Sequence, residues 1–316
     1  MVDTARVPIP QNPKPKTRHP KPTTQNPPPK NHHQNRNPAT CALKPAPAPV
    51  SNFILTLQPV MLKLKERLKE SPLVKGIVYA VVGIFTYPGI NMVNKLRISG
   101  MENLKGLPKK NVLFVSNHQT YFADVIVFIH IFCAFKWRKM NKLGIPYYLL
   151  SPFTRVKYVA AEETMKSSWL TKLFTLAGAL TVKRTWRAEE QEVRRGLDPG
   201  DTRKITRALN HNWVITFPQG TTKPFAPGRK GTAFIIKQQK PIVIPVMING
   251  FWRAFNKKGL KFKKRGSQLS VTFKPPMQIN YEDSSEAILE QIMDAIEQSR
   301  KYMLKGRHHQ LAEEEK

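Results

Sequence analysis

Short apolar runs alternate with segments of helical periodicity from about residue 96 onward, and this alternation limits the fold more than any other feature. The runs at 112–115, 214–217 and 242–248 are rich in Val, Ile and Phe and have the length of buried strands. Helical segments at 121–135 and 231–238 separate them. Strands that alternate with helices are typical of α/β domains, so the sequence predicts a mixed or parallel central sheet flanked by helices.

The other expected elements complete this α/β pattern. Further strands are expected at 96–101, 156–160, 179–182 and 269–273, and further helices at 169–177, 201–210 and 284–304. Side chains that accept a hydrogen bond from the first N–H groups of a helix mark two of the helix starts. We expect Asp201 to cap the helix at 201–210, and Ser284 or Ser285 to cap the last helix.

The first part of the chain differs in composition from the rest. Residues 1–50 are rich in Pro, Asn, Lys and Gln, contain one acidic residue, Asp3, and show no periodicity, so we expect them to be disordered. We divide the chain into this tail, membrane-associated helices over 51–95, an α/β domain over 96–306 and a polar tail over 307–316.

Two helices are expected within residues 51–95. Residues 51–70 place apolar side chains at helical spacing and lysines on the other faces, as in a helix that lies on a membrane surface or packs on the domain. Residues 73–93 are largely apolar but contain Lys75 and Pro88, and the unbroken part is shorter than the roughly 20 residues that span a bilayer. We expect a helix pair that dips into one leaflet; a single span and an ordinary core helix are the alternatives.

The net charge of +31 over 316 residues favours a polyanionic partner. Nucleic acid, an anionic membrane surface and a phosphorylated or acidic substrate all fit this description. The sequence has no recognisable nucleic-acid-binding fold, so we expect no nucleic-acid partner. It also has no Walker A, dinucleotide-binding or nucleophile-elbow motif, and its two cysteines form neither a disulfide framework nor a metal site.

His118 and Asp124 form the candidate catalytic pair. His118 follows a predicted strand and has a carboxylate a few residues away. Histidine titrates near neutrality and is a common general base, and a nearby carboxylate can hold its ring in one tautomer. The alternative is structural, with His118 capping a turn and Asp124 capping the next helix. His130, inside the apolar run, is expected to be a core residue.

Two basic stretches are candidate sites for anions. Around 221–223 and 228–231, glycine N–H groups lie beside hydroxyls and cations just before a helix, which suits a phosphate. A solvated turn with scattered basic residues is the alternative there. Residues 257–265 interleave lysines with apolar residues, and could lie on anionic lipid, contact nucleic-acid phosphates or form an exposed hairpin without a specific partner.

Four blocks together resemble the lysophosphatidate (1-acylglycerol-3-phosphate) acyltransferase family. They are Asn117-His118 with Asp124, Gly-Ala-Leu-Thr-Val-Lys-Arg at 178–184, Phe-Pro-Gln-Gly-Thr-Thr at 217–222 and Ile-Pro-Val at 244–246. They occur in the order and approximate spacing of the family. The resemblance implies a glycerolipid acyltransferase fold for the α/β domain, and the N-terminal helices are similar to the membrane-dipping pair of bacterial members.

The resemblance also implies roles for individual residues. His118 would take the proton from a glycerol hydroxyl as that hydroxyl attacks an acyl thioester, and Asp124 would orient the imidazole. The residues implied in binding the acceptor are Arg184, Gly220 and Thr221, with Lys183, Gln219, Thr222, Lys223 and Lys230 as further candidates. No metal, cofactor or covalent enzyme intermediate is implied.

The spacing of the candidate pair departs from the family pattern. Five residues separate His118 from Asp124 where the family has four. On one regular helix, this spacing would place the two side chains about 240° apart. The pair therefore requires a turn before the helix begins, with Tyr121 or Phe122 as the extra residue.

The acceptor motif departs as well. The family's Phe-Pro-Glu-Gly-Thr-Arg has Gln219 in place of the glutamate and Thr222 in place of the arginine. Lys223 can replace the arginine as a point charge, but not as a planar fork.

The expected function is acyl transfer from acyl-CoA or acyl carrier protein to lysophosphatidate, giving phosphatidate. We expect a monotopic enzyme on the cytoplasmic face of an anionic membrane, because both donors and the membrane suit a basic surface. The changed acceptor motif leaves another lysolipid acceptor as an alternative. The longer His–Asp spacing leaves a catalytically silent relative that binds anionic lipid as another.

Overall fold

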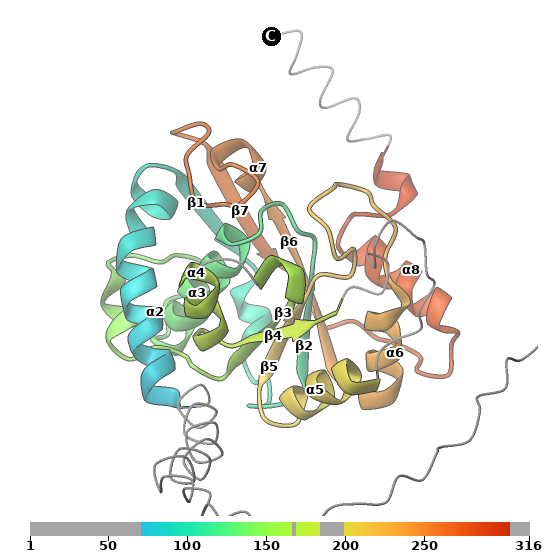
Figure 1. Cartoon of the computed structure of the whole chain (residues 1–316). Helices are drawn as coiled ribbons and strands as arrows, with labels where there is room; N and C mark the ends of the chain where they lie inside the picture. The colour runs from blue at the N-terminus through green and yellow to red at the C-terminus, as the bar shows by residue number, and fades with distance from the viewer. Residues whose placement is uncertain (1–70, 166–168, 184–198, 304–316) are drawn as a thin grey trace, which may run out of the picture. The chain divides into compact units, whose positions relative to one another are not determined.

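A mixed sheet of seven strands forms the centre of the part of the protein that the structure describes (Figure 1). The computed structural model describes residues 71–165, 169–183 and 199–303. The strands are β1 (Lys95–Ser99), β2 (Val112–Ser116), β3 (Val156–Ala161), β4 (Ala179–Val182), β5 (Trp213–Thr216), β6 (Ile242–Asn249) and β7 (Gln268–Phe273). Their order across the sheet is β1-β7-β6-β2-β5-β3-β4.

The strand directions place several loops at one edge of this sheet. The neighbouring strands β6, β2, β5, β3 and β4 are parallel to one another. β7 pairs antiparallel with β6 and parallel with β1. Because parallel strands end at the same edge, the loops that follow β2, β5 and β4 share the carboxyl edge of the sheet, where α/β proteins commonly place their sites.

Helices cover both faces of the sheet. They are α2 (Pro72–Tyr87), α3 (Ala123–Lys136), α4 (Trp169–Leu176), α5 (Pro199–Leu209), α6 (Lys230–Gln239), α7 (Phe251–Ala254) and α8 (Ser285–Ala295). Figure 1 shows α2, α3 and α4 over one face, and α5, α6 and α8 over the other. The predicted α/β class, with a mixed central sheet flanked by helices, is confirmed.

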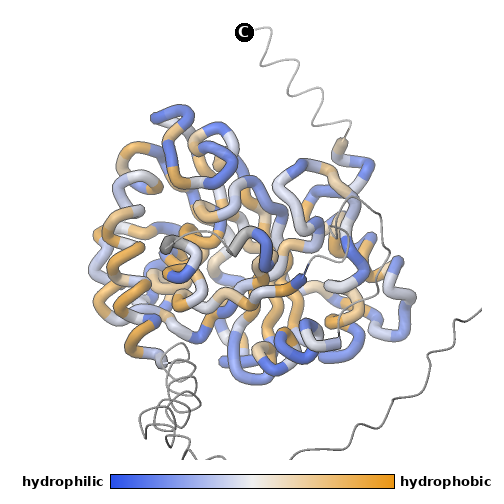
Figure 2. Tube along the Cα trace, viewed as in Figure 1, coloured by the Kyte–Doolittle hydropathy of each residue, from blue (hydrophilic) through white to orange (hydrophobic). Residues whose placement is uncertain are grey.

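Alternate residues of the central strands face opposite helical layers. In β2, Phe114 packs in the cluster that contains α3, whereas Leu113 and Val115 pack in the cluster of α5, α6 and α8. Figure 2 shows the resulting concentration of hydrophobic residues along the strands. Burial on both faces explains why these strands read as unbroken apolar runs in the sequence.

Helix α2 is attached to the domain along one face. The Lys75 ammonium is buried and donates hydrogen bonds to the carbonyls of Thr154, at 2.6 Å, and of Val156. The Tyr79 hydroxyl donates to the Ala177 carbonyl at 3.0 Å. A buried ammonium is costly without such acceptors, so these bonds hold the start of α2 against the domain.

Pro88 does not end the helical path, contrary to the break that we predicted there. A π-helical turn, Pro88–Met92, continues α2, and together they form a segment of 21 residues that is long and apolar enough to cross a membrane by length and composition. The helical path is therefore longer than the unbroken apolar part on which the prediction rested. The first of the two predicted helices, 51–70, lies outside the described residues.

The ends of two predicted helices also differ from the structure. Helix α5 begins at Pro199, so Asp201 lies in its first turn and is not its cap. Its carboxylate accepts a hydrogen bond from the Lys183 backbone N–H at 2.7 Å, which links α5 to the end of β4. Ser284 caps α8 as predicted, but α8 ends at Ala295, before the predicted end near 304.

His130 is a core residue, as predicted. Its ring bonds the Thr86 hydroxyl through Nε2 and the Tyr148 hydroxyl through Nδ1, each at 3.0 Å, and so joins α2, α3 and the segment Pro146–Leu150. Burial lowers the pKa of His130 to about 3, because the surroundings disfavour the charged ring.

This buried histidine should make the protein sensitive to acid. Stability that depends on neutral His130 is fully present above the unfolded pKa of about 6.5 and is lost as the pH falls toward the folded value. We expect the free energy of unfolding, measured in urea, to fall by roughly 2–3 kcal/mol more between pH 7 and pH 4.5 than in a His130→Gln variant. An equal fall in both proteins would contradict the prediction.

Candidate active site

The residues that the sequence singled out follow three parallel strands at the carboxyl edge of the sheet. Asn117 and His118 follow β2, Phe217 follows β5 and Lys183 follows β4. Strand β2 pairs with β5, β5 pairs with β3 and β3 pairs with β4, all in parallel. Segments distant in the sequence therefore share one edge.

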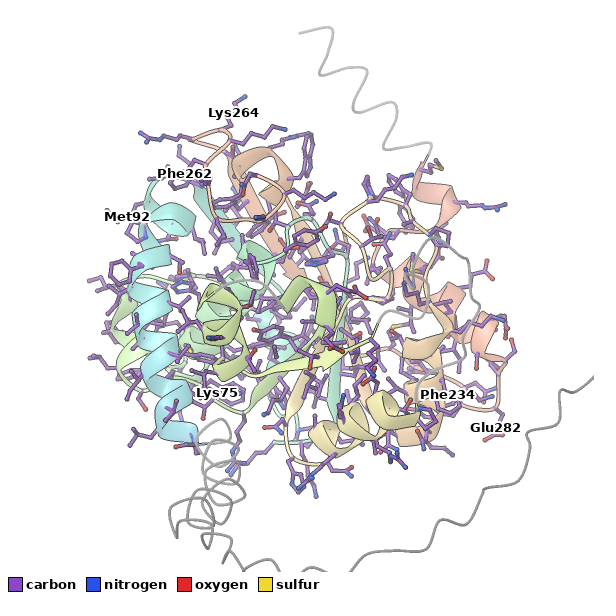
Figure 3. The ribbon with its side chains drawn as sticks, viewed as in Figure 1. Lys75, Met92, Phe234, Phe262, Lys264 and Glu282 are labelled. Carbon is purple, nitrogen blue, oxygen red and sulfur yellow. The ribbon has the colours of Figure 1, made fainter. Side chains whose placement is uncertain are left out.

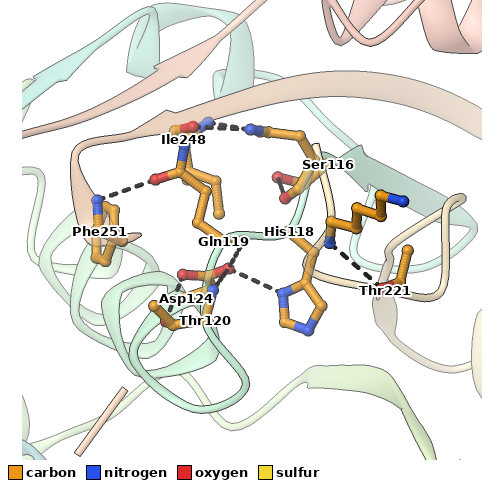
Figure 4. A network of polar contacts seen from close by, with 10 residues as sticks. Ser116, His118, Gln119, Thr120, Asp124, Thr221, Ile248 and Phe251 are labelled. Carbon is orange, nitrogen blue, oxygen red and sulfur yellow. Dashed lines mark hydrogen bonds and ion pairs between the residues drawn. The ribbon is translucent and has the colours of Figure 1, made fainter. Parts of the chain in front are cut away.

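His118 and Asp124 are in direct contact (Figure 4). His118 Nδ1 lies 2.8 Å from Asp124 Oδ2, and Asp124 is buried. Residues 117–122 form a turn and α3 begins at Ala123, so the turn that the longer spacing requires is present. Because a carboxylate accepts, Nδ1 carries the proton of this bond, and the second ring nitrogen, Nε2, faces away from Asp124.

Four donors surround the Asp124 carboxylate. Oδ2 accepts from the backbone N–H groups of Gln119, at 2.6 Å, and Thr120, at 2.9 Å, as well as from the His118 ring. Oδ1 accepts from the Thr120 hydroxyl at 2.8 Å. The carboxylate also lies in the first turn of α3, where the helix dipole favours a negative charge. These contacts compensate for the burial of a charge and fix the direction of the His118 ring.

Two neighbouring side chains tie this turn to the end of β6. The Asn117 amide donates to the Ile248 carbonyl and accepts from the Ile248 N–H, each at 2.8 Å, and thereby extends the pairing between β2 and β6. Gln119 Oε1 accepts from the Phe251 N–H, at the start of α7, at 2.9 Å. Figure 4 shows both contacts above the His118–Asp124 pair.

The turn is bound on its other side by a basic loop, which we define as residues 256–266. The N–H of Tyr121 donates to the Lys257 carbonyl at 3.1 Å, and the N–H of Phe122 donates to the Lys258 carbonyl at 3.0 Å. Gly259 fits closely against the turn: its φ is +76°, and a Cβ there would lie 2.6 Å from the Ala123 nitrogen. The loop therefore supports the two residues that we predicted to contain the insertion.

Replacing Gly259 by alanine should lower kcat by up to about 100-fold with little change in KM, because the methyl group would push the basic loop off the turn. Gly266→Ala is the matched control. Gly266 lies in the same loop with a φ of +71°, so it has the same backbone strain, but an added Cβ would meet no atom within 4 Å. Equal kinetics for the two variants would mean that the loop does not support the turn.

The ring of Phe217 stacks on the His118 ring, with 4.1 Å between the ring centres and 21° between the planes. The contact joins the Phe-Pro-Gln-Gly-Thr-Thr segment to the candidate base and covers one face of the imidazole. We did not predict this contact. The sequence signals for Phe217 are its place in the Phe-Pro-Gln-Gly-Thr-Thr block and its position directly after β5, at the same sheet edge as His118.

The Gln219–Gly220 turn carries an arginine that we did not predict. Arg229 Nε donates to the Gln219 carbonyl at 3.1 Å, and the Arg229 N–H donates to the Pro218 carbonyl at 2.9 Å. Gly220 has a φ of +61°, and a Cβ there would lie 2.7 Å from Arg229 Nε. A guanidinium therefore lies against the turn whose family motif has lost its own arginine.

The remaining predicted acceptor residues lie in different surroundings. The Gln219 side chain is buried and donates to the Ala226 carbonyl and to Gln298, at 3.0 and 3.1 Å, so it supports the fold of 217–226 and does not face an acceptor. The exposed Lys230 ammonium pairs with Glu286 on α8. Lys223 donates its N–H to the Thr221 hydroxyl at 3.3 Å. Lys183 is exposed at the end of β4, and Arg184 lies outside the described residues.

The site is a His–Asp pair at the carboxyl edge of the sheet in a three-layer α/β fold. A comparison with protein families identifies the class of enzyme. Residues 95–249 match the family model Acyltransferase. These residues form an acyltransferase domain, and the chain is an acyltransferase.

The structure is similar to the crystal structure of the 1-acyl-sn-glycerophosphate acyltransferase PlsC from Thermotoga maritima, at 17% sequence identity and a TM-score of 0.42, over 78% of this chain and 85% of that chain. No curated protein sequence matches this chain.

Proposed function

We propose that this acyltransferase moves a fatty acyl chain from a thioester donor to the free hydroxyl of lysophosphatidate, giving phosphatidate. The observation that carries the proposal is the contact of His118 Nδ1 with the buried Asp124 carboxylate, at 2.8 Å. That contact leaves Nε2 as the nitrogen that can accept a proton from a substrate.

The pair performs acyl transfer without a nucleophile of its own. His118 Nε2 takes the proton of the glycerol hydroxyl while the hydroxyl oxygen attacks the thioester carbonyl carbon. The carbon–sulfur bond then breaks, and the imidazolium returns the proton to the leaving thiolate. Asp124 holds the ring in the required tautomer and compensates the charge that forms on it. These steps require neither a metal nor a covalent enzyme intermediate.

The acceptor phosphate is bound beside the Gly220–Thr221 turn. The Arg229 guanidinium against this turn supports that assignment, because it brings a positive charge to the turn. Lys223 follows the turn directly. From the family resemblance, Arg184 is retained as a phosphate ligand, with Lys183 and Lys230 as helpers. Gln219 has a supporting role because its amide is turned inward.

A different lysolipid acceptor is the second candidate. It is favoured by the loss of the motif arginine at Thr222, because an arginine from another position need not reach the same phosphate oxygens. In either case the donor is acyl-CoA or acyl carrier protein. We place the enzyme as a monotopic protein on the cytoplasmic face of a membrane. The exposed apolar face of α2, with Leu73, Ile77 and Phe85 between 57% and 81% exposed, supports the association with a membrane.

The test is thiol release from acyl-CoA by the purified full chain in detergent micelles, with and without lysophosphatidate. We expect release that depends on lysophosphatidate and yields phosphatidate by mass spectrometry. Release with another lysolipid alone would reassign the acceptor. No release with either donor across a panel of lysolipids, from a folded protein, would overturn the proposal and favour a lipid-binding relative without turnover.

A further inference from the structure

The basic loop is strongly cationic and exposed. Between α7 and β7 it carries six basic side chains, all exposed: Lys257, Lys258, Lys261, Lys263, Lys264 and Arg265. No acidic residue occurs anywhere from 202 to 281, so the sequence around the loop offers no compensating charge. A cluster of this kind attracts an anionic surface or polymer.

Apolar side chains are interleaved with these cations. Leu260 and Phe262 are 44% and 43% exposed, although both belong to residue types that are normally buried. The Phe262 ring stacks on Phe255, with 5.5 Å between ring centres, and also lies over Gly89, where a Cβ would be 3.0 Å from its tip. The loop is therefore packed on the π-helical turn that continues α2.

The loop and α2 form one continuous exposed surface. Figure 3 shows Phe262 and Lys264 at the same end of the molecule as Met92, the last residue of the π-helical turn, which is 71% exposed. From there an exposed apolar stripe runs back along α2 at helical spacing: Phe85, Ile84, Val81, Ile77 and Leu73. A cationic loop at the end of an apolar stripe matches the two layers of an anionic lipid surface, with acyl chains below and phosphates above.

The same loop supports the candidate catalytic turn. The carbonyls of Lys257 and Lys258 accept the N–H groups of Tyr121 and Phe122, and Gly259 lies against Ala123. The same few residues thus contact the turn through their backbone and face the solvent with their side chains. Because the loop contacts the turn directly, any loss of motion in the loop should also reduce the motion of the turn.

We propose that the basic loop docks on an anionic lipid surface and that this docking rigidifies the turn that carries His118 and Asp124. The importance of the turn for catalysis rests on the proposed function, whereas docking and rigidification are properties of the chain itself. The enzyme would then be more active at an anionic membrane than in neutral micelles. Nucleic acid would use the lysines, but it offers no apolar layer for Phe262, Leu260 and the stripe of α2.

Vesicle binding and hydrogen exchange test the proposal together. The full chain is titrated with phosphatidylcholine vesicles, with and without phosphatidylglycerol. Lys261→Gln, Lys263→Gln and Lys264→Gln combined should weaken binding to the anionic vesicles on the order of 100-fold. Anionic vesicles should also slow deuterium exchange of the Tyr121 and Phe122 amides about tenfold in the unaltered protein, and not in this variant.

The matched control removes the same charge elsewhere. Lys105, Lys109 and Lys110 are exposed just before β2, at the opposite end of the sheet from the basic loop. Their triple change to glutamine should leave both the anionic binding and the slowed exchange in place. Replacing Lys261, Lys263 and Lys264 by arginine should restore both effects, because charge and not lysine itself is required.

Three outcomes would overturn the proposal. Equal binding of anionic vesicles by the loop variant and the unaltered protein would exclude docking through the loop. Unchanged exchange of the two amides in bound protein would exclude coupling to the turn. Tighter binding of a single-stranded oligonucleotide than of anionic vesicles, lost in the loop variant, would assign the loop to nucleic acid. None of these readouts requires turnover, so failure of the proposed reaction would be seen separately in the thiol-release assay.

Discussion

His118→Ala is expected to lower kcat for lysophosphatidate-dependent thiol release by at least about 1,000-fold, with KM for either substrate nearly unchanged. The ring is the only group in the proposed mechanism that accepts the proton of the attacking hydroxyl, and general-base catalysis contributes about 10² to 10⁴. Its side chain is 12% exposed, stacks on Phe217 and bonds to Asp124, so its loss should also lower the stability of the protein. Steady-state kinetics in micelles, with thermal unfolding alongside, measure both effects.

His211→Ala provides the control for this substitution. His211 is exposed in the turn between α5 and β5, and its side chain makes no hydrogen bond within the part of the chain that the structure describes. The control should retain normal turnover and stability. A His118→Ala enzyme that kept more than a tenth of the normal kcat would exclude His118 as the base.

Asp124→Asn should separate the charge of this residue from its geometry. One oxygen of the amide can still accept from the Gln119 and Thr120 N–H groups and from His118, and its NH₂ group can donate to the Thr120 hydroxyl, which also accepts. The turn should therefore persist, while the negative charge that stabilises the imidazolium is lost. We expect kcat to fall about 100- to 1,000-fold, measured by the same kinetics, with a small change in melting temperature.

Asp124→Ala measures how much the Asp124 carboxylate contributes to the stability of the turn. Removing both oxygens leaves buried donors of the turn without acceptors, which costs roughly 1–3 kcal/mol for each group. This variant should have a clearly lower free energy of unfolding in urea than Asp124→Asn. Its kcat should be at most slightly lower than that of Asp124→Asn. If Asp124→Asn retained normal kcat, the carboxylate would be a structural cap, as in the alternative reading of the sequence.

The elements that the sequence predicted well are those with strong periodicity and burial on both faces. Strands β2 and β6 and helix α3 lie within two residues of their predicted positions, because long apolar runs have few other ways to be buried. The His118–Asp124 contact could also be predicted, since both residues are close in the sequence and the spacing excluded a single helix. For residues this close in the sequence, local backbone geometry is enough to predict the contact.

The contacts that could not be predicted join residues far apart in the sequence. Phe217 reaches His118, and the Lys257 carbonyl reaches Tyr121, only because the parallel strands bring distant loops to one edge. Arg229 could not be placed beside Gly220 without knowing how 221–228 folds back. The continuation of α2 past Pro88 was not predicted, because proline lacks a backbone N–H and usually ends a helix. Here a π-helical turn accommodates the proline.

The extra residue between His118 and Asp124 has a consequence for how such enzymes are found. Four successive amide groups, from Gln119 to Phe122, each have an acceptor other than a helical backbone carbonyl: Asp124 Oδ2 for two of them, and the basic-loop carbonyls for the others. The extra residue is thus accommodated because the surroundings supply an acceptor for each peptide N–H of the turn. Acyltransferases with still other spacings are therefore to be expected wherever a neighbouring loop offers more or fewer free carbonyls, and searches with a fixed spacing will pass over them.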